Sequence, residues 1–303
     1  MFGVRILIVG GGVLGTMHAW QAVQRGHDVV QLEREPEARG ASVRNFGLIW
    51  VSGRANGAEL STALRARTLW QQIAERVPAL GFRPSGSLTV LRTEAELTVA
   101  NELVARADAA ERNTKLVGAQ EVREINPALR GECLGALWCD ADASVEPRTA
   151  QPALRSALIE SGRYTWVPGR EVRALTDAGV VDDHGERHAG DVVVLCTGAW
   201  LGGLVREVAG EVPVRRVRLQ MAQTEPLGEP LTTAVADADS LRYYPAYQGA
   251  ALDELRRSQP QPEVASRNAM QLLMVQRSDG SLTIGDTHSY DQPFGFDVTV
   301  HAA

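Results

Sequence analysis

The 303-residue sequence has few cysteines and aromatic residues, a single lysine and no long apolar run. Its three cysteines, Cys133, Cys139 and Cys196, are too few for a disulfide framework and lack metal-ligand spacing, so we expect reduced thiols and no metal site. No segment approaches the roughly 20 apolar residues of a membrane-spanning helix. The apolar start of the chain runs into glycines and not into a signal-peptide cleavage site. We therefore expect a cytoplasmic protein without a membrane span.

The charge balance is acidic, with 31 basic against 37 acidic side chains and a net charge of -6. Binding to a phosphate backbone requires a basic stripe, which this sequence lacks, so nucleic acid is not an expected partner. The apolar fraction of 44% and the charged fraction of 22% are typical of a globular protein. A chain of this length can form one large core or two smaller ones.

The start of the chain predicts a βαβ unit. Residues 4–9 form a short apolar run bounded by glycines, which is typical of a strand buried on both faces of a parallel sheet. Residues 14–24 have helical spacing, and residues 28–32 read as a second strand. A second fully apolar strand over residues 191–196 indicates that the parallel sheet resumes later in the chain.

Between and after these segments, the hydrophobic pattern changes and indicates a different layer of the structure. Helices are predicted over residues 60–76, 93–110, 121–125 and 148–160, and strands over 81–91, 137–139, 171–175 and 282–284. Alternating residues over 212–224 and 240–247 predict antiparallel strands with one side facing solvent or a ligand. The polar segment 249–268 is predicted to be a loop.

A glycine motif, G-x-G-x-x-G, stands where the first strand turns into the first helix. Gly10 permits the tight turn, Gly12 lets a pyrophosphate approach the main chain, and Gly15 lets helix and strand pack closely. Glu33, at the end of the second strand, is placed to accept hydrogen bonds from ribose hydroxyls, and its charge argues against NADP. The alternative is a glycine turn without a ligand. NAD and FAD share this cradle, so the motif alone does not choose between them.

The sequence resembles the group of FAD-dependent oxidoreductases that contains glycine oxidase, sarcosine oxidase and D-amino-acid oxidases and dehydrogenases. The resemblance extends over nearly the whole chain and rests on residues 6–12 with Glu33, 41–47, 193–200 and 284–287. More narrowly, residues 39–47 and 285–290 resemble a branch associated with phosphonate breakdown. The resemblance implies an FAD-binding, Rossmann-like α/β domain with a mostly parallel sheet, interleaved with an α+β substrate domain built on an antiparallel sheet.

The resemblance also implies domain boundaries. We expect residues 1–78, 144–212 and 281–303 to form the FAD domain, and residues 79–143 and 213–280 to form the substrate domain. The group normally closes the FAD site with a further C-terminal segment, and this chain is expected to lack it.

Carried over residue by residue, the resemblance implies a set of FAD contacts. The pyrophosphate would lie against the first turn, the ribose at Glu33, the flavin beside the loop after the second strand, and the adenine at the main chain of a later strand. The residues concerned are Gly10, Gly12, Val13, Leu14, Gly15, Glu33, Ser42, Asn45, Phe46, Val172, Thr197 and Gly198. The plainer alternatives are that Ser42 and Asn45 only cap a turn and that Val172 is simply core.

The substrate side is predicted from chemistry. An arginine fork assisted by a phenol matches the oxygens of a carboxylate or phosphonate. On a predicted strand, Arg242 and Tyr244 share one face, and Tyr243 points the other way. Arg44 and His288 are expected to complete the pocket, with His288 holding a substrate oxygen or influencing proton removal from the amine. The alternative is that Arg242 and Tyr244 form a surface pair on an edge strand.

The leading hypothesis is an FAD enzyme that oxidises the C–N bond of a small anionic amine to an imine by hydride transfer to the flavin. The amine is an amino acid, an N-methyl amino acid or an aminophosphonate, and dioxygen or another electron acceptor restores the flavin. The alternatives are an NAD-dependent dehydrogenase and a truncated, non-catalytic dinucleotide-binding protein.

Overall fold

The computed structural model describes residues 3–290, 293–295 and 298, which fall into two compact units. Unit 1 consists of Met1–Asn45, Val77–Leu80 and Pro147–Arg215. Unit 2 consists of Phe46–Arg76, Gly81–Glu146 and Arg216–Ala303. The chain therefore passes between the units several times, as expected of an interleaved architecture.

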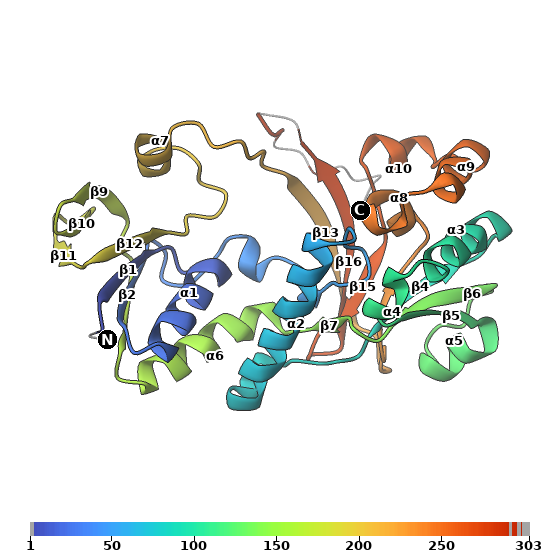
Figure 1. Cartoon of the computed structure of the whole chain (residues 1–303), viewed down its shortest axis with the longest axis horizontal. Coiled ribbons are helices and arrows are strands. Elements are labelled where there is room, and N and C mark those ends of the chain that lie inside the picture. The colour runs from blue at the N-terminus through green and yellow to red at the C-terminus, as the bar shows by residue number, and fades with distance from the viewer. Residues whose placement is uncertain (1–2, 291–292, 296–297, 299–303) are drawn as a thin grey trace. The chain divides into compact units, whose positions relative to one another are not determined.

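Unit 1 is built on a four-stranded parallel sheet with strand order β12-β1-β2-β8. Strand β1 is central, and Ile6 lies opposite Val192 on one side and Val29 on the other. Helices α1 and α6 pack beside this sheet (Figure 1). The apolar side chains of β1 and β2 form the unit's core together with two residues of a smaller antiparallel sheet, Val172 and Val180. The predicted α/β class with a parallel sheet is confirmed.

The elements of unit 1 agree closely with the predicted βαβ start. The parallel strands are β1 (Arg5–Val9), β2 (Asp28–Glu33), β8 (Tyr164–Pro168) and β12 (Val192–Leu195). The antiparallel sheet contains β9 (Val172–Thr176), β10 (Gly179–Asp182) and β11 (Arg187–Ala189). The helices are α1 (Val13–Gln24), η1 (Ala41–Val43), η2 (Pro78–Leu80), α6 (Pro147–Glu160) and α7 (Leu204–Ala209).

Unit 2 is built on a seven-stranded mixed sheet with strand order β13-β16-β15-β14-β4-β6-β5. Its neighbours are antiparallel except for the parallel pair β14 and β4. The strands are β4 (Ser87–Leu91), β5 (Thr114–Gly118), β6 (Gly135–Cys139), β13 (Arg218–Pro226), β14 (Ala234–Ala236), β15 (Leu273–Gln276) and β16 (Ser281–Ser289). A separate pair joins β3 (Leu48–Ile49) to β7 (Ala143–Ser144).

Helices complete unit 2. They are α2 (Ala58–Arg76), α3 (Glu94–Val104), α4 (Asp108–Glu111), α5 (Ala119–Ile125), α8 (Asp239–Tyr243), η3 (Pro245–Tyr247), α9 (Ala250–Ser258) and α10 (Glu263–Arg267). Helix α3 begins with a capping box in which Thr93 accepts from the Glu96 amide and the Glu96 side chain accepts from the Thr93 amide. Helix α3 also packs against α9.

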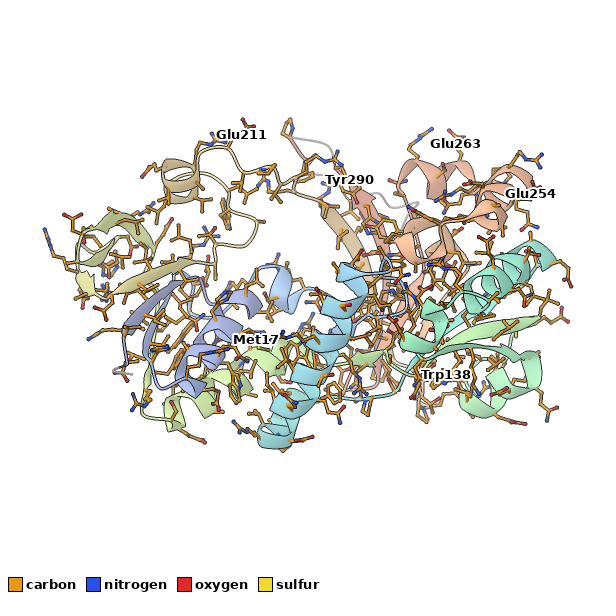
Figure 2. All side chains as sticks on the ribbon, viewed as in Figure 1. Met17, Trp138, Glu211, Glu254, Glu263 and Tyr290 are labelled. Carbon is orange, nitrogen blue, oxygen red and sulfur yellow. The ribbon has the colours of Figure 1, made fainter. Side chains whose placement is uncertain are left out.

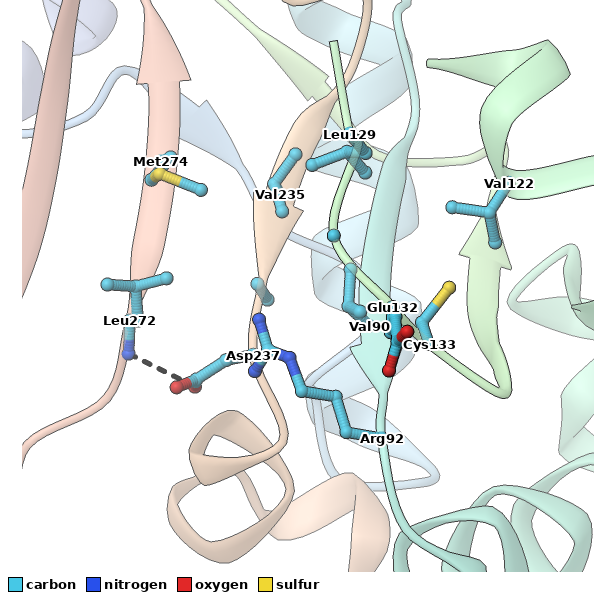
Figure 3. Close-up of a pocket in the computed structure, with 12 residues that line it drawn as sticks. Val90, Arg92, Val122, Leu129, Glu132, Cys133, Val235, Asp237, Leu272 and Met274 are labelled. Atoms are coloured by element: carbon cyan, nitrogen blue, oxygen red, sulfur yellow. Dashed lines mark hydrogen bonds between the residues drawn. The ribbon is translucent and has the colours of Figure 1, made fainter. Parts of the chain in front are cut away.

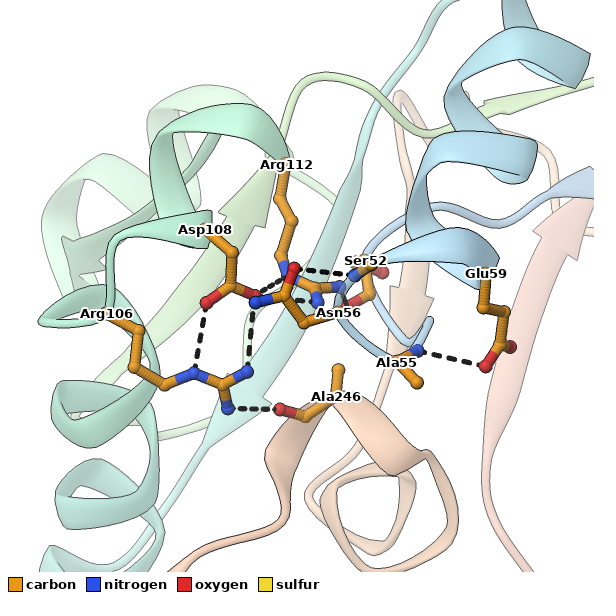
Figure 4. Close-up of polar contacts among 9 residues, drawn as sticks. Ser52, Ala55, Asn56, Glu59, Arg106, Asp108, Arg112 and Ala246 are labelled. Carbon is orange, nitrogen blue, oxygen red and sulfur yellow. Dashed lines mark hydrogen bonds and ion pairs between the residues drawn. The ribbon is translucent and has the colours of Figure 1, made fainter.

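A buried ion-pair network ties α4 to the loop after β3 (Figure 4). The Arg112 side chain is 0% exposed, bonds the Asp108 carboxylate at 2.8 Å and donates to the Ser52 carbonyl oxygen at 3.1 Å. Arg106 binds the same carboxylate and donates to the Ala246 carbonyl oxygen at 2.7 Å. These bonds lower the pKa of Asp108 against the opposing effect of its burial. The network is a structural brace within unit 2.

The structure corrects two predictions for residues 240–268. Residues 240–247 were predicted to be a strand, but they form the end of α8 and the short helix η3. Residues 249–268 were predicted to be a loop, but they contain α9 and α10. The reason is tertiary: Leu241, Leu252 and Leu255 are fully buried in one cluster with α3, so helical spacing places their side chains in the core.

The structure also differs from the predicted domain boundaries. Residues 46–76 cluster with unit 2 and not with unit 1. Strand β16 was expected in the FAD domain, but it pairs with β13 and β15 in the seven-stranded sheet. The remainder of the predicted 281–303 segment includes residues 291–292, 296–297 and 299–303, which lie outside the described residues.

Candidate functional site

The turn from β1 to α1 contains glycines at positions where neighbouring backbone atoms leave no room for a side chain. Gly10 has φ +112°, and a Cβ on it would lie 2.2 Å from the Cys196 carbonyl oxygen. A Cβ on Gly15 would lie 2.1 Å from the Gly10 carbonyl oxygen. Each position therefore excludes a side chain through backbone contacts alone. This is the close helix–strand packing that the motif predicts.

The N-terminus of α1 is arranged as an anion-binding end. Gly12 is the N-cap residue, and the first turn contains no acidic residue. The Val13 amide donates to Ser42 Oγ at 2.9 Å, and the Leu14 side chain is 63% exposed. The first amides of a helix have no acceptor within the helix, and its dipole favours negative charge at this end. A diphosphate fits this chemistry.

Glu33 is held at the edge of the same turn. Its Oε2 accepts the Gly11 amide at 2.6 Å, and its Oε1 accepts the Glu35 amide at 3.0 Å. A Cβ on Gly11 would lie 2.5 Å from the Trp166 ring and 3.0 Å from the Glu33 side chain. The carboxylate is thus fixed beside the helix N-terminus, and its predicted contact with a ribose stays a prediction. Trp166 is a neighbour of the cradle for which no role was predicted.

Two residues of the predicted flavin loop have structural partners. Asn45 Nδ2 donates to the Ala41 carbonyl oxygen at 2.8 Å and so closes the η1 turn. Phe46 is buried in unit 2, in a cluster with Trp50 and residues of β14 and β15. Their predicted flavin contacts stay predictions, whereas Ser42 does lie at the cradle through its bond to the Val13 amide.

The other predicted FAD contacts lie on β9 and after β12. The Val172 side chain is buried in the core of unit 1, and the predicted contact of its main chain with adenine stays a prediction. Thr197 and Gly198 follow β12, which lies beside β1 in the sheet. Thr197 Oγ1 donates to the Trp200 carbonyl oxygen at 2.8 Å, and Gly198 has φ +62°. These two residues are therefore at the same end of the parallel sheet as Gly10.

An aromatic cluster stands in unit 2 and consists of Trp50, Tyr243, Tyr244, His288 and Tyr290. Tyr243 stacks on the His288 ring with centroids 4.1 Å apart and meets Tyr244 edge-on at 5.1 Å. Its hydroxyl lies 3.3 Å from that of Tyr290, which follows β16 and is labelled in Figure 2. Trp50 packs on Tyr244 at 5.7 Å. The predicted strand places Tyr243 on the opposite face from Tyr244. In the structure, Tyr243 contacts both Tyr244 and His288.

A polar network lies behind this aromatic cluster. Gln271 Nε2 donates to Tyr244 Oη at 3.2 Å and to Asp286 Oδ1 at 3.1 Å. Burial raises the pKa of Asp286 and raises that of Tyr244 to about 12. Among the described residues, Trp50 Nε1 and Gln271 Oε1 are buried without a hydrogen-bond partner. No role was predicted for Gln271 or Asp286, although Asp286 stands in the 284–287 segment that carries the family resemblance.

His288 has a defined tautomer in this network. Its Nδ1 lies 2.9 Å from the Ala269 carbonyl oxygen, which only accepts, so Nδ1 carries the proton. Its Nε2 lies 3.8 Å from Asp286 Oδ2. The imidazole therefore presents Nε2 as a proton acceptor next to a carboxylate that would stabilise the protonated ring.

Arg242 is not arranged as a substrate fork. It lies on α8 and not on a strand, its Nε bonds Asp239 Oδ1 at 3.0 Å, and its Nη2 donates to the Gln259 carbonyl oxygen at 2.5 Å. Arg44 belongs to unit 1, where it lines a cavity. Of the four predicted substrate residues, Tyr244 and His288 lie in the aromatic cluster, where both contact the Tyr243 ring.

Two further features of the structure are separate from this cluster. A cavity of about 70 Å³ in unit 2 is lined by Arg92, Cys133 and Asp237, among others (Figure 3). Burial raises the pKa of Asp237 to about 6, although its carboxylate accepts the Leu272 amide. The residues Asp182, Glu186 and His188 in unit 1 have metal-ligand types, but the Arg170 guanidinium already bonds both carboxylates at 2.9 and 3.1 Å.

The fold and the glycine cradle define a dinucleotide-binding α/β protein. The sequence profile of the family described as "FAD dependent oxidoreductase" matches residues 5–303, so the chain belongs to this family. The cofactor of the family is FAD, and the NAD-dependent alternative is not favoured. None of the helices in the described part of the chain has the length and hydropathy needed to span a bilayer.

Several similar proteins are amino-acid oxidases by name, and others are glycerol-3-phosphate dehydrogenases. Glycine oxidase of Geobacillus kaustophilus is 25% identical over 238 residues, which cover 72% of this chain and 63% of that protein. D-amino-acid oxidase of Streptomyces coelicolor is 30% identical over 271 residues, which cover 86% and 74%. The solved structure of glycine oxidase from Bacillus cereus matches with a TM-score of 0.73 at 18% identity, covering 99% of this chain and 75% of that one, which shows the shared fold. In sequence, the match thus spans less than two thirds of the Geobacillus glycine oxidase.

Proposed function

We propose that this protein oxidises the C–N bond of a small anionic amine to an imine. The substrate class is an amino acid, an N-methyl amino acid or an aminophosphonate, and dioxygen or another acceptor takes the electrons afterwards. The observation that carries the proposal is the cradle at the start of α1, where Gly12 and Ser42 line the helix N-terminus and Glu33 is pinned beside it. Bound FAD supplies a hydride acceptor, which this family uses.

The residues of unit 2 would prepare the amine. Hydride leaves a substrate carbon readily only when the neighbouring nitrogen is uncharged, so the ammonium proton must go to a base. His288 Nε2 is that base in the proposal, because Nδ1 is committed to the Ala269 carbonyl oxygen. Asp286, 3.8 Å away, would stabilise the imidazolium. Water then hydrolyses the released imine to a carbonyl compound and an amine or ammonia.

The aromatic cluster would hold the substrate in place. The phenols of Tyr243 and Tyr290 are hydrogen-bond donors at its exposed edge, and Tyr244 closes its buried side. The expected arginine fork has less support, because Arg242 would have to give up both Asp239 and Gln259. A contribution of Arg44 stays a prediction.

The test is the visible spectrum of the purified chain, followed by anaerobic addition of glycine, sarcosine, D-alanine and aminomethylphosphonate. We expect a flavin spectrum, after reconstitution with FAD if necessary, and bleaching by at least one amine. A chain that does not bind FAD, or a flavin that only a non-amine such as glycerol 3-phosphate bleaches, would refute the proposal.

Two variants test the assigned base. His288→Gln should lower the rate of bleaching by about 100-fold or more and change its pH profile. His184→Gln is the matched control, since His184 is an exposed histidine in the turn between β10 and β11. An unchanged pH profile in His288→Gln would exclude His288 as the base.

The Arg242→Ala variant distinguishes the predicted role of Arg242 in substrate binding from a structural role in its ion pair with Asp239. The contacts with Asp239 and Gln259 predict a loss of stability with little change in the substrate concentration for half-maximal bleaching. A tenfold rise in that concentration at unchanged stability would restore Arg242 to the substrate site.

A further inference from the structure

Unit 1 contains a second candidate site, a cavity of about 310 Å³ between the segment after β2 and the first turn of α6. Three arginines line it: Arg39 and Arg44 from the segment around η1, and Arg148 from α6. Gln151 and Pro152 line it from the next turn of α6, and Glu37 lines the opposite side. None of these lining residues belongs to the cradle of Gly12, Val13 and Ser42.

The charge in this cavity is positive. The single lining carboxylate, Glu37, is already bound by Nη2 of Arg155, whose side chain is 5% exposed. The exposed Arg39 is 4.0 Å from Glu35, which does not line the cavity. Helix α6 has 14 residues and no acidic residue in its first turn, so its N-terminal dipole adds to the positive field. Three guanidinium groups around one cavity are suited to an anion with several oxygens.

One buried polar atom at the cavity lacks a partner. Gln151 is 2% exposed and lines the cavity, and its Oε1 has no hydrogen-bond partner among the described residues. A buried polar atom without a partner destabilises the fold, and a ligand that supplies the partner would remove this penalty. Gln151 Oε1 accepts hydrogen bonds only, so its partner must be a donor.

We propose that this cavity binds the phosphate or phosphonate group of a small molecule. Such a group offers oxygens to Arg39, Arg44 and Arg148 and, when singly protonated, a P–OH donor to Gln151 Oε1. The cavity is several times the roughly 30 Å³ that a water molecule occupies in the liquid, so it has room for a substituent on phosphorus.

The site is coupled to the FAD cradle through η1. Val43 and Arg44 line the cavity, and Ser42, the preceding residue, accepts the Val13 amide in the cradle. An anion that orders η1 therefore also holds Ser42 in place. The coupling depends on the FAD binding of the proposed function, whereas anion binding to the cavity does not depend on FAD. Because coupling is reciprocal, the anion should tighten FAD binding by the factor by which FAD tightens anion binding.

The first experiment measures anion binding to the FAD-free chain at pH 6.5 and constant ionic strength, by calorimetry for every probe and also by 31P line broadening for the two that contain phosphorus. The probes are inorganic phosphate, methylphosphonate and sulfate. We expect phosphate to bind at least tenfold more tightly than sulfate, which has no hydroxyl for Gln151. Tighter binding of methylphosphonate than of phosphate would assign the site to phosphonates, and the reverse order to phosphates. Absence of phosphate binding, or equal affinity for sulfate, would overturn the proposal.

The variants locate the site. Arg148→Gln should weaken phosphate binding at least tenfold, and Gln151→Leu should abolish the preference over sulfate. Arg123→Gln is the control, because Arg123 is an exposed arginine on α5 of unit 2. The melting temperature of each variant without ligand verifies its fold, and Arg39→Gln replaces Arg148→Gln if the latter is unfolded. Unchanged affinity in the folded variants would refute the assignment.

The coupling is tested by FAD titration with and without phosphate. We expect phosphate to lower the dissociation constant of FAD about fivefold in the wild type and not in Arg148→Gln. If phosphate instead competes with FAD, and Arg148→Gln loses FAD in phosphate-free buffer, the arginines hold the cofactor itself and the proposed second site does not exist.

Discussion

Gly15→Ala is the sharpest test of the cradle, because the structure specifies what the added methyl group meets. The Cβ would lie 2.1 Å from the Gly10 carbonyl oxygen, 2.7 Å from Gln31 Nε2 and 3.1 Å from Ile8 Cγ2. A carbon–oxygen contact normally exceeds about 3.3 Å, so α1 must move away from β1 by about 1.2 Å.

The cost follows from three contributions. Overpacking of this kind costs about 1–3 kcal/mol. Loss of the bond from Gln31 Nε2 to the Gly10 carbonyl oxygen costs about 1 kcal/mol more. Replacing glycine by alanine within a helix returns about 1 kcal/mol. We therefore expect a net loss of about 1–3 kcal/mol in the free energy of unfolding.

The assay is urea unfolding of the FAD-free chain followed by tryptophan fluorescence, together with an FAD titration. Displacement of the α1 N-terminus should also weaken FAD binding at least tenfold. Gly40→Ala is the matched control in unit 1, because nothing lies within 4 Å of its Cβ position and its φ is -80°. A Gly15→Ala variant as stable as Gly40→Ala, with unchanged FAD affinity, would refute the packing argument.

Three further predictions concern unit 2. Asp237 has a pKa raised to about 6, so its protonated form stabilises the fold at pH 4 and this contribution is lost as the pH rises to about 6. Asp237→Asn should therefore gain up to about 3 kcal/mol relative to the wild type between pH 4 and pH 7 in urea unfolding, and a pH-independent difference would contradict this. Arg112→Met should cost about 3–5 kcal/mol by leaving Asp108 poorly paired, and adding Asp108→Leu should recover part of it. Burial raises the pKa of Cys139, so a thiol reagent should label Cys133 at least tenfold faster, as mass spectrometry of the labelled peptides would show.

The local features of unit 1 could be predicted from the sequence. The turn from β1 to α1 and the position of Glu33 depend on residues close together in the chain, so their order and spacing determine them. The apolar run of β1 likewise predicts a central strand of the parallel sheet, because strands buried on both faces need continuous apolar residues. The run of β12 predicts a strand of the same sheet, but β12 lies at its edge and its side chains are partly exposed. Family membership agrees with these predictions.

The sites formed by distant residues were decided by the tertiary structure. Residues 240–247 alternate as a strand would, yet burial of Leu241 against α3 makes α8 the more stable choice, and this turns Arg242 toward Asp239 and brings Tyr243 onto His288. The cavity of Arg39 and Arg148 joins segments that are far apart in the chain. Local sequence sets the conformations available to a segment, but the free energy of burying its side chains depends on partners that only the complete fold provides.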